Sequence, residues 1–479
     1  MKKNPYFLFF LFVFTFYNLN AQSKKWTLQD CVDFALKNNI SIKQTELDAQ
    51  TTAINKKDAL GNFLPNVNAT ASHSWNIGLN QNITTGLLQN QTTQFTSAGI
   101  NANIDIYNGL QNQNRLRKAN LSNTAAQFQL LKMRDDVALN VANAFLQIVF
   151  NKENLKVQKD QLTNDEKQQK RSEELVTAGV VPRGDLLDVK ATVAADGQKV
   201  IAAENNLFLS KLSLAQLLQL DDFQNFDIAD VDYEAKQSPT MLEKAEDIVA
   251  KAKKERIELK IARTNLELAE KDVTIAKGAY QPSLTGFYSF SSRVSYADRV
   301  TSYNIDSSNP TAPIGYVDGT NQLVLQPNYI PTLGKPLPFF DQFSNNKGHN
   351  FGVQLNIPIL NGLATRNNVA RSKIAVERSK TTLQQTEQDL ERNVYTAITN
   401  AKGALNSYEA SVSALEARKE ALNYAKEKYA VGMMNSFDYN QSQILFSTAQ
   451  SEVLRTKYDY IFKVKIVEFY FGIPITDKK

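Results

Sequence analysis

Two aspartates stand at matching places in this chain, and their spacing suggests a joint role. Asp185 lies six residues after Gly179, and Asp438 lies six residues after Gly432. One interpretation is structural, because glycine can end a helix in the left-handed conformation and aspartate can cap the next helix. The other is functional, because copies of both carboxylates around one axis would select cations and could close a constriction. The spacing alone leaves both interpretations open.

Signatures of enzymatic catalysis are missing from the sequence. It contains no phosphate-binding loop, no Gly-x-Ser-x-Gly, no His-Glu-x-x-His and no dinucleotide glycine pattern. The two histidines, His73 and His349, stand far from any acidic cluster. We therefore expect no enzyme, no cofactor and no resident metal. A net charge of +5 spread over 479 residues does not suggest nucleic acid as a partner either.

A very long helical pattern leads to each of the two glycines. In the second pattern, apolar residues recur at intervals of three, four and once seven, which is a heptad stripe on one helix face. The stripe consists of Leu390, Val394, Ala397, Ala401, Leu405, Tyr408, Val412, Leu415 and Leu422. A helix over residues 365–431 would be about 100 Å long, and a second helix would return to about Phe471. Such a hairpin has little interior and must pack against copies of itself.

The chain contains two copies of one plan. Residues 99–220 align with residues 352–473 at a constant offset of 253, and the segments before them align at an offset of 217. Each copy reads helix, strand, strand, long helix, returning helix, and the second carries 36 extra residues between its strands. We expect a first repeat at 22–220, a linker at 221–240 that packs around the middle of the helices, and a second repeat at 241–479.

Each copy contains two stretches in which apolar and polar residues alternate. The apolar sets are Val67, Ala69 and Ala71; Ala98, Ile100, Ala102, Ile104 and Ile106; Leu284, Gly286, Tyr288 and Phe290; and Phe351, Val353, Leu355, Ile357 and Ile359. Stretches of roughly ten residues suit membrane-spanning strands, and Phe63, Tyr107 and Tyr280 would form an aromatic girdle at one end. A soluble sheet with one solvated face has the same period. We expect a polar loop at 76–94 and an irregular, proline-rich extracellular loop at about 291–349 that could cover the pore.

The first 21 residues have the pattern of a secretory signal peptide. Lys2 and Lys3 precede a short apolar run, and a small residue, Ala21, stands at the expected cleavage site. The single cysteine, Cys31, follows Asp30, so a lipid anchor and intrachain disulfides are not expected, and the thiol is interpreted as a small core residue. No later stretch offers the apolar length of a membrane-spanning helix.

Four strands cannot close a barrel in lipid, where every sheet edge must be paired. Closed barrels need at least about eight strands, so at least two chains must contribute. Two chains would leave a lumen nearly filled by side chains, whereas three would supply twelve strands and a passage. The heptad stripes make the same demand, because each hairpin needs neighbours. The sequence therefore predicts an obligate oligomer whose barrel continues into a helical tube.

These features together resemble the TolC family of outer membrane efflux proteins. The resemblance rests on the signal peptide, the duplicated plan, and the paired turns Ala178-Gly179 and Val431-Gly432 with their aspartates. It implies an α+β membrane protein: a homotrimer with a 12-stranded antiparallel barrel, four strands per chain, and a long periplasmic α-helical barrel. It also implies passive export of drugs, metals or proteins through the outer membrane of a Gram-negative cell, in a tripartite efflux or type I secretion system. The implied partners are a periplasmic adaptor (membrane fusion) protein and an inner membrane efflux pump or ABC exporter.

The resemblance also implies which residues close the periplasmic aperture. Asp185, Asp438 and Tyr429 match the family pattern, whereas Gln441 and Met434 stand where the family has an acid and an arginine. First-half residues that could compensate are Asp188 and Arg183.

The adaptor contact would fall on the same hairpin ends, in segments 176–188 and 429–441, which include Gly179, Pro182, Gly432 and Met434. Two other classes of protein remain open from the sequence. One is a non-conducting structural or adhesive stalk at the cell surface, and the other is a soluble periplasmic coiled-coil adaptor.

Overall fold

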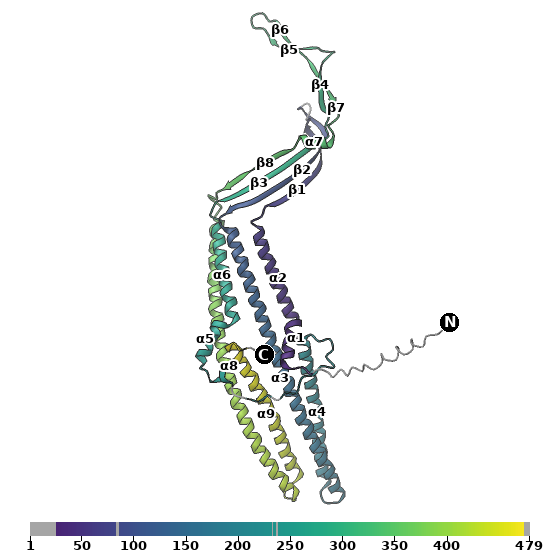
Figure 1. Cartoon of the computed structure of the whole chain (residues 1–479). Helices are drawn as coiled ribbons and strands as arrows, with labels where there is room; N and C mark the ends of the chain where they lie inside the picture. The colour runs from purple at the N-terminus through teal and green to yellow at the C-terminus, as the bar shows by residue number, and fades with distance from the viewer. Residues whose placement is uncertain (1–24, 83–85, 232, 236–237, 474–479) are drawn as a thin grey trace, which may run out of the picture. The chain divides into compact units, whose positions relative to one another are not determined.

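The computed structural model describes residues 25–82, 86–231, 233–235 and 238–473 (Figure 1). The predicted signal peptide lies outside the described residues. The helices and strands of the first half are α1 (Leu28–Asn38), α2 (Ile40–Gly61), β1 (Asn66–Gln81), β2 (Leu88–Asn108), α3 (Gln111–Thr177) and α4 (Arg183–Leu218). Those of the second half are η2 (Pro239–Leu242), α5 (Ala245–Glu255), α6 (Ile257–Gly278), β3 (Ser283–Ser295), β4 (Arg299–Ile305), β5 (Thr311–Tyr316), β6 (Leu323–Pro327), β7 (Tyr329–Gly334), α7 (Phe339–Asn345), β8 (Gly348–Asn356), α8 (Ala364–Ala430) and α9 (Ser436–Phe471).

Corresponding helices of the two halves have equal lengths. α1 and α5 have 11 residues each, and α2 and α6 have 22. The long helices α3 and α8 both have 67 residues, and the returning helices α4 and α9 both have 36. Equal lengths keep equivalent side chains at equivalent heights along each hairpin, so each position in one half has a definite counterpart in the other.

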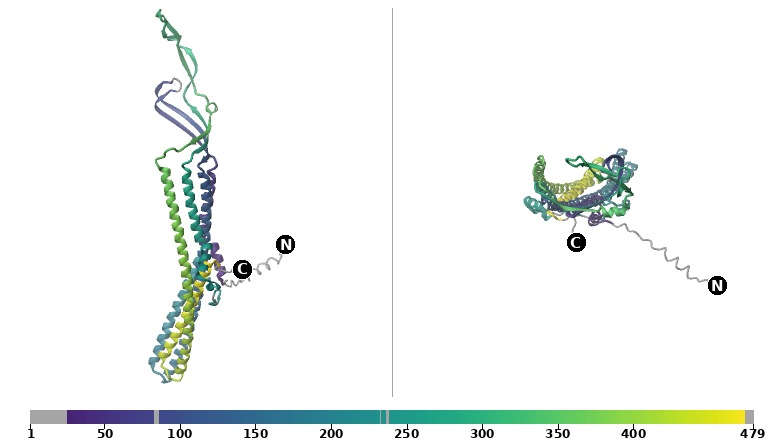
Figure 2. Two further views of the ribbon diagram at one scale, coloured as in Figure 1. Left: turned by 90° about the vertical axis from the view of Figure 1, so that its left-hand side faces the viewer. Right: turned by 90° about the horizontal axis from the view of Figure 1, so that it is seen from above.

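The chain divides into two compact units. A helical unit comprises Met1–Ile54, Asn120–Ala269 and Ala375–Lys479, and a second unit with the sheets comprises Asn55–Ala119 and Glu270–Ile374. In the helical unit α4 and α9 lie side by side (Figure 2). None of the helices that the structure describes combines the length and the apolarity needed to cross a membrane.

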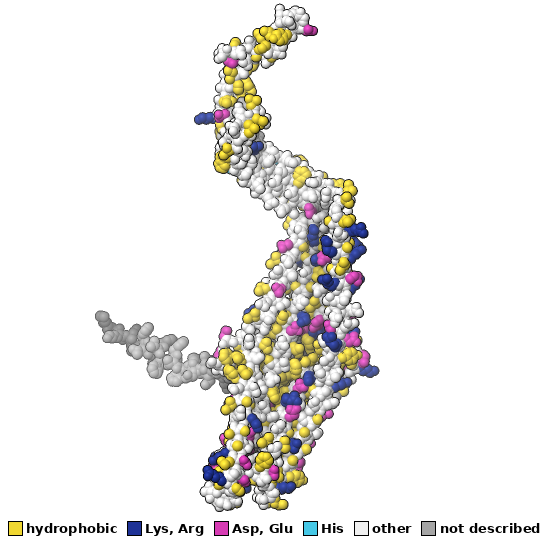
Figure 3. Space-filling view, turned by 180° about the vertical axis from the view of Figure 1, so that it is seen from behind, with side chains coloured by type: hydrophobic (Ala, Val, Ile, Leu, Met, Phe, Trp, Pro, Cys, Tyr) yellow, Lys and Arg dark blue, Asp and Glu magenta, His cyan; other side chains and the backbone are white. Residues whose placement is uncertain are grey.

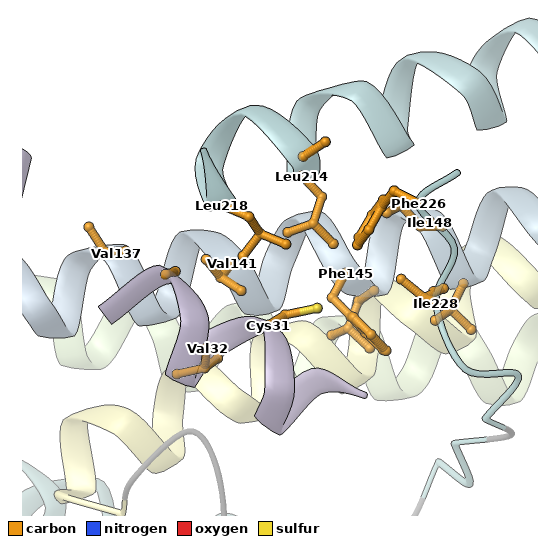
Figure 4. Close-up of a cluster of buried hydrophobic side chains, with 14 of the residues drawn as sticks. Cys31, Val32, Val137, Val141, Phe145, Ile148, Leu214, Leu218, Phe226 and Ile228 are labelled. Atoms are coloured by element: carbon orange, nitrogen blue, oxygen red, sulfur yellow. The ribbon is translucent and has the colours of Figure 1, made fainter. Parts of the chain in front are cut away.

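The helical unit is held together by two apolar clusters that repeat each other. In the first, α1 packs on α3 and α4 through side chains such as Val141 and Leu218, which have less than 1% of their surface exposed, and Ile228 of the linker joins them (Figure 4). In the second, α5 packs on α8 and α9. The buried residues Ile248, Val249 and Ala252 of α5 occupy the places of Cys31, Val32 and Ala35 of α1. Burial of apolar area, at about 25 cal/mol per Å², is the main force that joins these helices.

Burial in the helical unit tests two predictions. Cys31 is fully buried among apolar neighbours, as expected of a small core residue. Leu390, Val394 and Ala401 of the heptad stripe are buried, but Tyr408 is only half-buried within one chain.

The second unit contains a four-stranded antiparallel sheet in the order β1-β2-β3-β8. Its register aligns the alternating residues into rows. Val67, Ala102, Tyr288 and Phe351 stand opposite one another on one face. The neighbouring row, on the other face, is polar and consists of Asn68, Asn101, Ser289 and Asn350. The sheet therefore has an apolar face and an amide- and hydroxyl-rich face, and its two outer strands, β1 and β8, each leave one edge unpaired.

The predicted polar loop at 76–94 is largely strand, which corrects the sequence analysis. β1 continues to Gln81 and pairs there with Leu88, so the two strands have 16 and 21 residues rather than about ten. The amide side chains bond within the ladder instead of ending it. For example, the Nδ2 of Asn80 donates to the backbone oxygen of Gln91 at 2.9 Å.

The inserted segment is not an irregular loop. It contains two ribbons, in which β4 pairs with β7 and β5 with β6, followed by the short helix α7. The prolines that suggested irregularity lie where a strand or helix tolerates them: Pro327 ends β6, Pro338 precedes α7, and Pro331 lies in a ribbon that has only edge strands. Tyr303 and Leu325 are among the apolar side chains exposed on these ribbons. Figure 3 shows hydrophobic side chains on the surface of this part of the chain.

Candidate functional site at the helical hairpin ends

Both hairpins of the helical unit turn through a glycine in the left-handed conformation. The φ angle is +72° at Gly179 and +74° at Gly432. In each turn a 6→1 hydrogen bond closes the helix end: Val180 N–H donates to the carbonyl of Leu175, and Met433 N–H donates to that of Lys428, both at 2.8 Å. This is the Schellman arrangement, and it confirms the predicted role of the glycines as helix terminators.

The interpretation of the two aspartates as helix caps is wrong. α4 begins at Arg183 and its N-cap is Pro182, which makes no side-chain cap bond. α9 begins at Ser436, and its cap is Asn435, whose side-chain oxygen accepts the N–H of Asp438 at 2.8 Å. Both helices begin earlier than expected, so the aspartates become their third residues. There the negative carboxylates interact favourably with the positive end of the helix dipole, and neither carboxylate serves as a cap.

The two carboxylates remain available for contacts outside the chain. Asp438 is exposed and Asp185 half-exposed, and neither side chain has a hydrogen bond or ion pair among the described residues. Arg183, Asp188 and Gln441 are also exposed, and the described part of the chain supplies no side-chain partner to them. The structure therefore places all five residues near the hairpin ends but does not join them within one chain.

Tyr429 is the predicted site residue with clear contacts. Its hydroxyl accepts a hydrogen bond from Nε2 of Gln168 at 2.8 Å, which ties the last turn of α8 to α3. Its ring stacks on that of Tyr439 in α9, with centroids 4.8 Å apart and planes 8° apart. Met434 lies half-buried in the turn that follows Gly432. Tyr429 thus joins the two hairpins of one chain near their ends.

A buried pair of carboxyl groups near these ends escaped the sequence analysis. Asp165 of α3 and Asp196 of α4 are each 2% exposed and hydrogen-bond to each other. Nε2 of Gln161 donates to Asp165 at 2.8 Å, and Nζ of Lys199 donates to Asp196 at 2.8 Å. Two carboxylates cannot bond directly unless one holds a proton, so the pair shares a proton between the helices of the first hairpin.

The surroundings of the pair shift the pKa values of its two carboxyl groups in opposite directions. Burial, together with the hydrogen bond and negative charge of Asp196, raises the pKa of Asp165 to about 7. Burial also opposes ionisation of Asp196, but hydrogen bonds from Asp165 and Lys199 outweigh it and lower the pKa of that carboxyl. Across the hairpin contact, burial and the charge of Asp165 raise the pKa of Tyr439. Tyr439, in the first turn of α9, therefore lies within range of the charge of Asp165.

The interior between the hairpin ends is polar, in contrast with the apolar clusters farther along the helices. Residues of α9 buried there include Ser436, Asn440, Gln443 and Ser447. The Oε1 of Gln443 is buried without a donor in the described chain. Buried polar layers are costly when their bonds are incomplete, so this layer contributes less to stability than an apolar layer of the same area. Only one sequence signal pointed to it: Gln161, Asp165 and Ser172 continue a helical stripe with polar residues.

These features define a class: proteins in which a four-stranded antiparallel sheet is joined to long helical hairpins with polar ends. Residues 32–219 and 248–464 match the outer membrane efflux protein family, and the chain therefore belongs to that family. Among curated proteins none matches.

Solved structures show the same fold at low sequence identity. The CmeC outer membrane channel of Campylobacter jejuni superposes with a TM-score of 0.74 at 18% identity, covering 94% of this chain and 87% of that one. The CusC structures, described as showing changes that accompany transmembrane channel formation, give 0.72 at 15%, covering 93% and 91%. VceC of Vibrio cholerae gives 0.71 at 13%, covering 93% and 96%.

The family fixes the general function. The chain is an outer membrane efflux channel of the tripartite type, with a periplasmic helical domain, and it is a transport protein rather than an enzyme. The stalk and soluble-adaptor alternatives are therefore set aside.

Proposed function

We propose that the chain works as a homotrimer. Three four-stranded sheets close a 12-stranded barrel, and the hairpins of three chains form the periplasmic tube. The observation that carries this proposal is the sheet itself: it has a continuous apolar face, a polar face, and unpaired edges on β1 and β8. Unpaired backbone groups cannot be left in lipid, so copies of the sheet must pair with one another. Three copies give a lumen wide enough for cargo.

The polar face of the sheet lines this lumen, and the ribbons inserted between β3 and β8 face the outside of the cell. Cargo passes passively after delivery by an inner membrane transporter through a periplasmic adaptor. Drugs, metals and proteins are the cargo classes that such a duct serves, in a tripartite efflux or type I secretion system.

The hairpin ends form the closed aperture of this tube. In the trimer three copies of Asp185 and three of Asp438 face one axis, and their unpartnered carboxylates bond to Arg183, Gln441 or water of a neighbouring copy. Tyr429 holds the two hairpins of each chain in register through Gln168 and Tyr439. The turn residues beside Gly179, Pro182, Gly432 and Met434 contact the adaptor. Val180 and Met433 support this assignment, because they are apolar and 67% and 77% exposed.

Single-channel recording in a planar bilayer tests the aperture. The Asp185→Asn, Asp438→Asn double variant keeps the side-chain volume and removes six negative charges from the proposed ring. We expect small, cation-preferring steps from the wild-type trimer, and larger steps with at least several-fold weaker cation preference from the double variant. Asp160→Asn is the matched control, because Asp160 is an exposed carboxylate of α3 away from the turn. Conductance and selectivity unchanged in the double variant would show that these aspartates do not form the aperture.

A further inference from the structure

The four strands of the large sheet contain only two charged side chains, if histidine is counted as neutral. They are Asp105 in β2 and Arg293 in β3. Asp105 lies four residues after Asn101 of the polar row, so its side chain is on the polar face. Arg293 lies four residues after Ser289 of the same row and shares that face.

The two charges stand near opposite ends of the polar face. Arg293 is paired with Ser97, which lies eight residues before Asp105 on β2. Eight residues of extended strand measure about 27 Å. Charges so far apart are screened from each other at physiological salt, so Asp105 does not neutralise Arg293. The end of the polar face next to the ribbons is therefore positive.

The guanidinium of Arg293 rests on an aromatic ring. Its central carbon lies 3.5 Å from the centroid of the Phe95 ring, and Phe95 is only 8% exposed. Within the described chain no carboxylate forms an ion pair with Arg293, and the side chain is exposed. A guanidinium that lies on a ring keeps its N–H donors at the rim, where they can bind a carboxylate, sulfate or phosphate group in bidentate fashion.

The backbone that carries Arg293 is fixed by α7 and its cap, which lie beside the end of β3 (Figure 1). Nδ2 of Asn346 donates to the backbone oxygen of Arg293 at 2.7 Å. Gln342 bonds to Ser295 twice: its Oε1 accepts the backbone N–H at 3.0 Å, and its Nε2 donates to the backbone oxygen at 2.9 Å. A charged group on a backbone held in this way is positioned before any ligand arrives.

A hollow opens on the polar face beside Arg293. It lies over a row of small residues that stand side by side across the four strands: Thr70, Gly99, Ser291 and Gly348. Its volume is about 350 Å³, and its polar lining includes Arg293, Asn101, Asn346, Thr70, Ser97 and Ser291. No carboxylate is among the described residues that line it. A guanidinium with amide and hydroxyl donors around it suits the oxygens of an anion.

We propose that this hollow is an anion subsite of the export lumen, which holds a carboxylate, sulfate or phosphate group of the cargo. The inference rests on the proposed homotrimer, in which the polar face lines the lumen, and it adds a cargo class to that function: small anionic molecules. Three copies of Arg293 then form a positive ring near the outer mouth, opposite in sign to the aspartates of the proposed aperture. Because each chain contributes one exposed guanidinium, the ring attracts anions without trapping them.

Anion binding is tested first, with inorganic sulfate as the probe and the full-length protein in detergent. Thermal melting is followed with sulfate and with sodium chloride at the same ionic strength, so that general salt effects cancel. We expect sulfate to raise the melting temperature of the wild type more than that of Arg293→Gln. Arg293→Lys keeps the charge but not the planar fork, so it should fall between them.

The matched control is Arg299→Gln, which removes an exposed arginine of the neighbouring ribbon instead. Its response to sulfate should equal that of the wild type. Because the hollow belongs to one chain, this measurement does not depend on the trimer. An Arg293→Gln protein that sulfate stabilises as much as the wild type would refute the subsite and leave the proposed function standing.

Placement of the subsite in the lumen is tested by single-channel recording of the trimer in a planar bilayer. We expect sulfate to reduce the current through the wild type, and Arg293→Gln to need about ten-fold more sulfate for the same reduction. Arg299→Gln should behave as the wild type does. Sulfate that stabilises the wild type through Arg293 but leaves its current unchanged would place the polar face outside the lumen. That result, or a monomeric mass in detergent, would overturn the proposed function itself.

Discussion

Replacing Asp165 by asparagine should change how the stability of the first hairpin depends on pH. Asparagine has the shape of the protonated acid: its oxygen can accept from Gln161 and its amide can donate to Asp196, so the bonds of the pair survive. What disappears is the titration. The variant should therefore match the wild type only at a pH low enough to protonate Asp165 in both the folded and the unfolded chain, and it should exceed the wild type in stability increasingly as the pH rises above that range.

The size of the effect follows from the pKa of Asp165. Its ordinary value is 3.8, and the folded protein raises it to about 7. Between these values the folded state holds a proton that the unfolded state has lost, so the free energy of unfolding falls by about 1.4 kcal/mol per pH unit as pH rises. From pH 5 to pH 7 this amounts to roughly 2–3 kcal/mol. The lowered pKa of Asp196 acts in the opposite sense, but only below its ordinary value of 3.8.

Thermal melting followed by helix circular dichroism at pH 5 and pH 8 measures this difference. We expect Asp165→Asn to melt somewhat above the wild type at pH 5 and several degrees further above it at pH 8. Asp160→Asn, an exposed carboxylate on the same helix, should show the same difference from the wild type at both values. Asp196→Asn removes the neighbouring charge but not the burial, so it should reduce the pH dependence without abolishing it. An Asp165→Asn melting shift that is equal at pH 5 and pH 8 would refute the reasoning.

Two further predictions concern the adaptor contact and the turns at Gly109 and Gly278, whose backbones lie very close together. Gly109→Ala forces a methyl group against the backbone of Gly278 at a residue with φ of +57°. We expect the free energy of unfolding to fall by about 3 kcal/mol or more, seen as little folded protein in the membrane; a normal yield would contradict this. Val180→Asp with Met433→Asp places charges on the exposed apolar hairpin ends, and we expect efflux in cells to fall while the purified channel conducts as before. Efflux at the wild-type rate would remove these residues from the adaptor contact.

The parts of the fold that repeat were the parts that the sequence could predict. A constant offset located both hairpins, and glycine at Gly179 and Gly432 fixed their turns because no other residue adopts positive φ so cheaply. The period of two in the strands placed Val67, Ala102 and Tyr288 on one face, and the register puts them in one row. Periodicity indicates which face of a helix or strand a residue occupies. In a duplicated chain, this information together with the offset of the repeat predicts most of the architecture.

Features that depend on where a helix or strand ends were predicted less well. The spacing allows Asp438 to be a helix cap, because aspartate is a good one, but Asn435 is equally good and lies nearer the turn. The polarity of residues 76–94 predicts a loop, because amide side chains are rare in strands. In this hairpin the amide of Asn80 bonds to the ladder, and pairing continues to Gln81. Local preference could not show these outcomes, because Asn435 and Asp438 compete for the cap and the partner strand decides how far β1 continues.

The carboxyl pair could not be found in the sequence, because Asp165 and Asp196 meet only through the relative height of two helices. Their counterparts at the offset of 253, Arg418 and Ala449, carry no such pair, so the two hairpins of each chain differ at this level. The charge of Asp165 reaches Tyr439 of the second hairpin, which stacks on Tyr429. In the proposed trimer the six hairpins would therefore alternate, and loss of a proton would weaken every second one. Because the same layer holds Tyr429 against Gln168, that asymmetry falls where the two hairpins of one chain are joined, close to the aspartates of the proposed aperture.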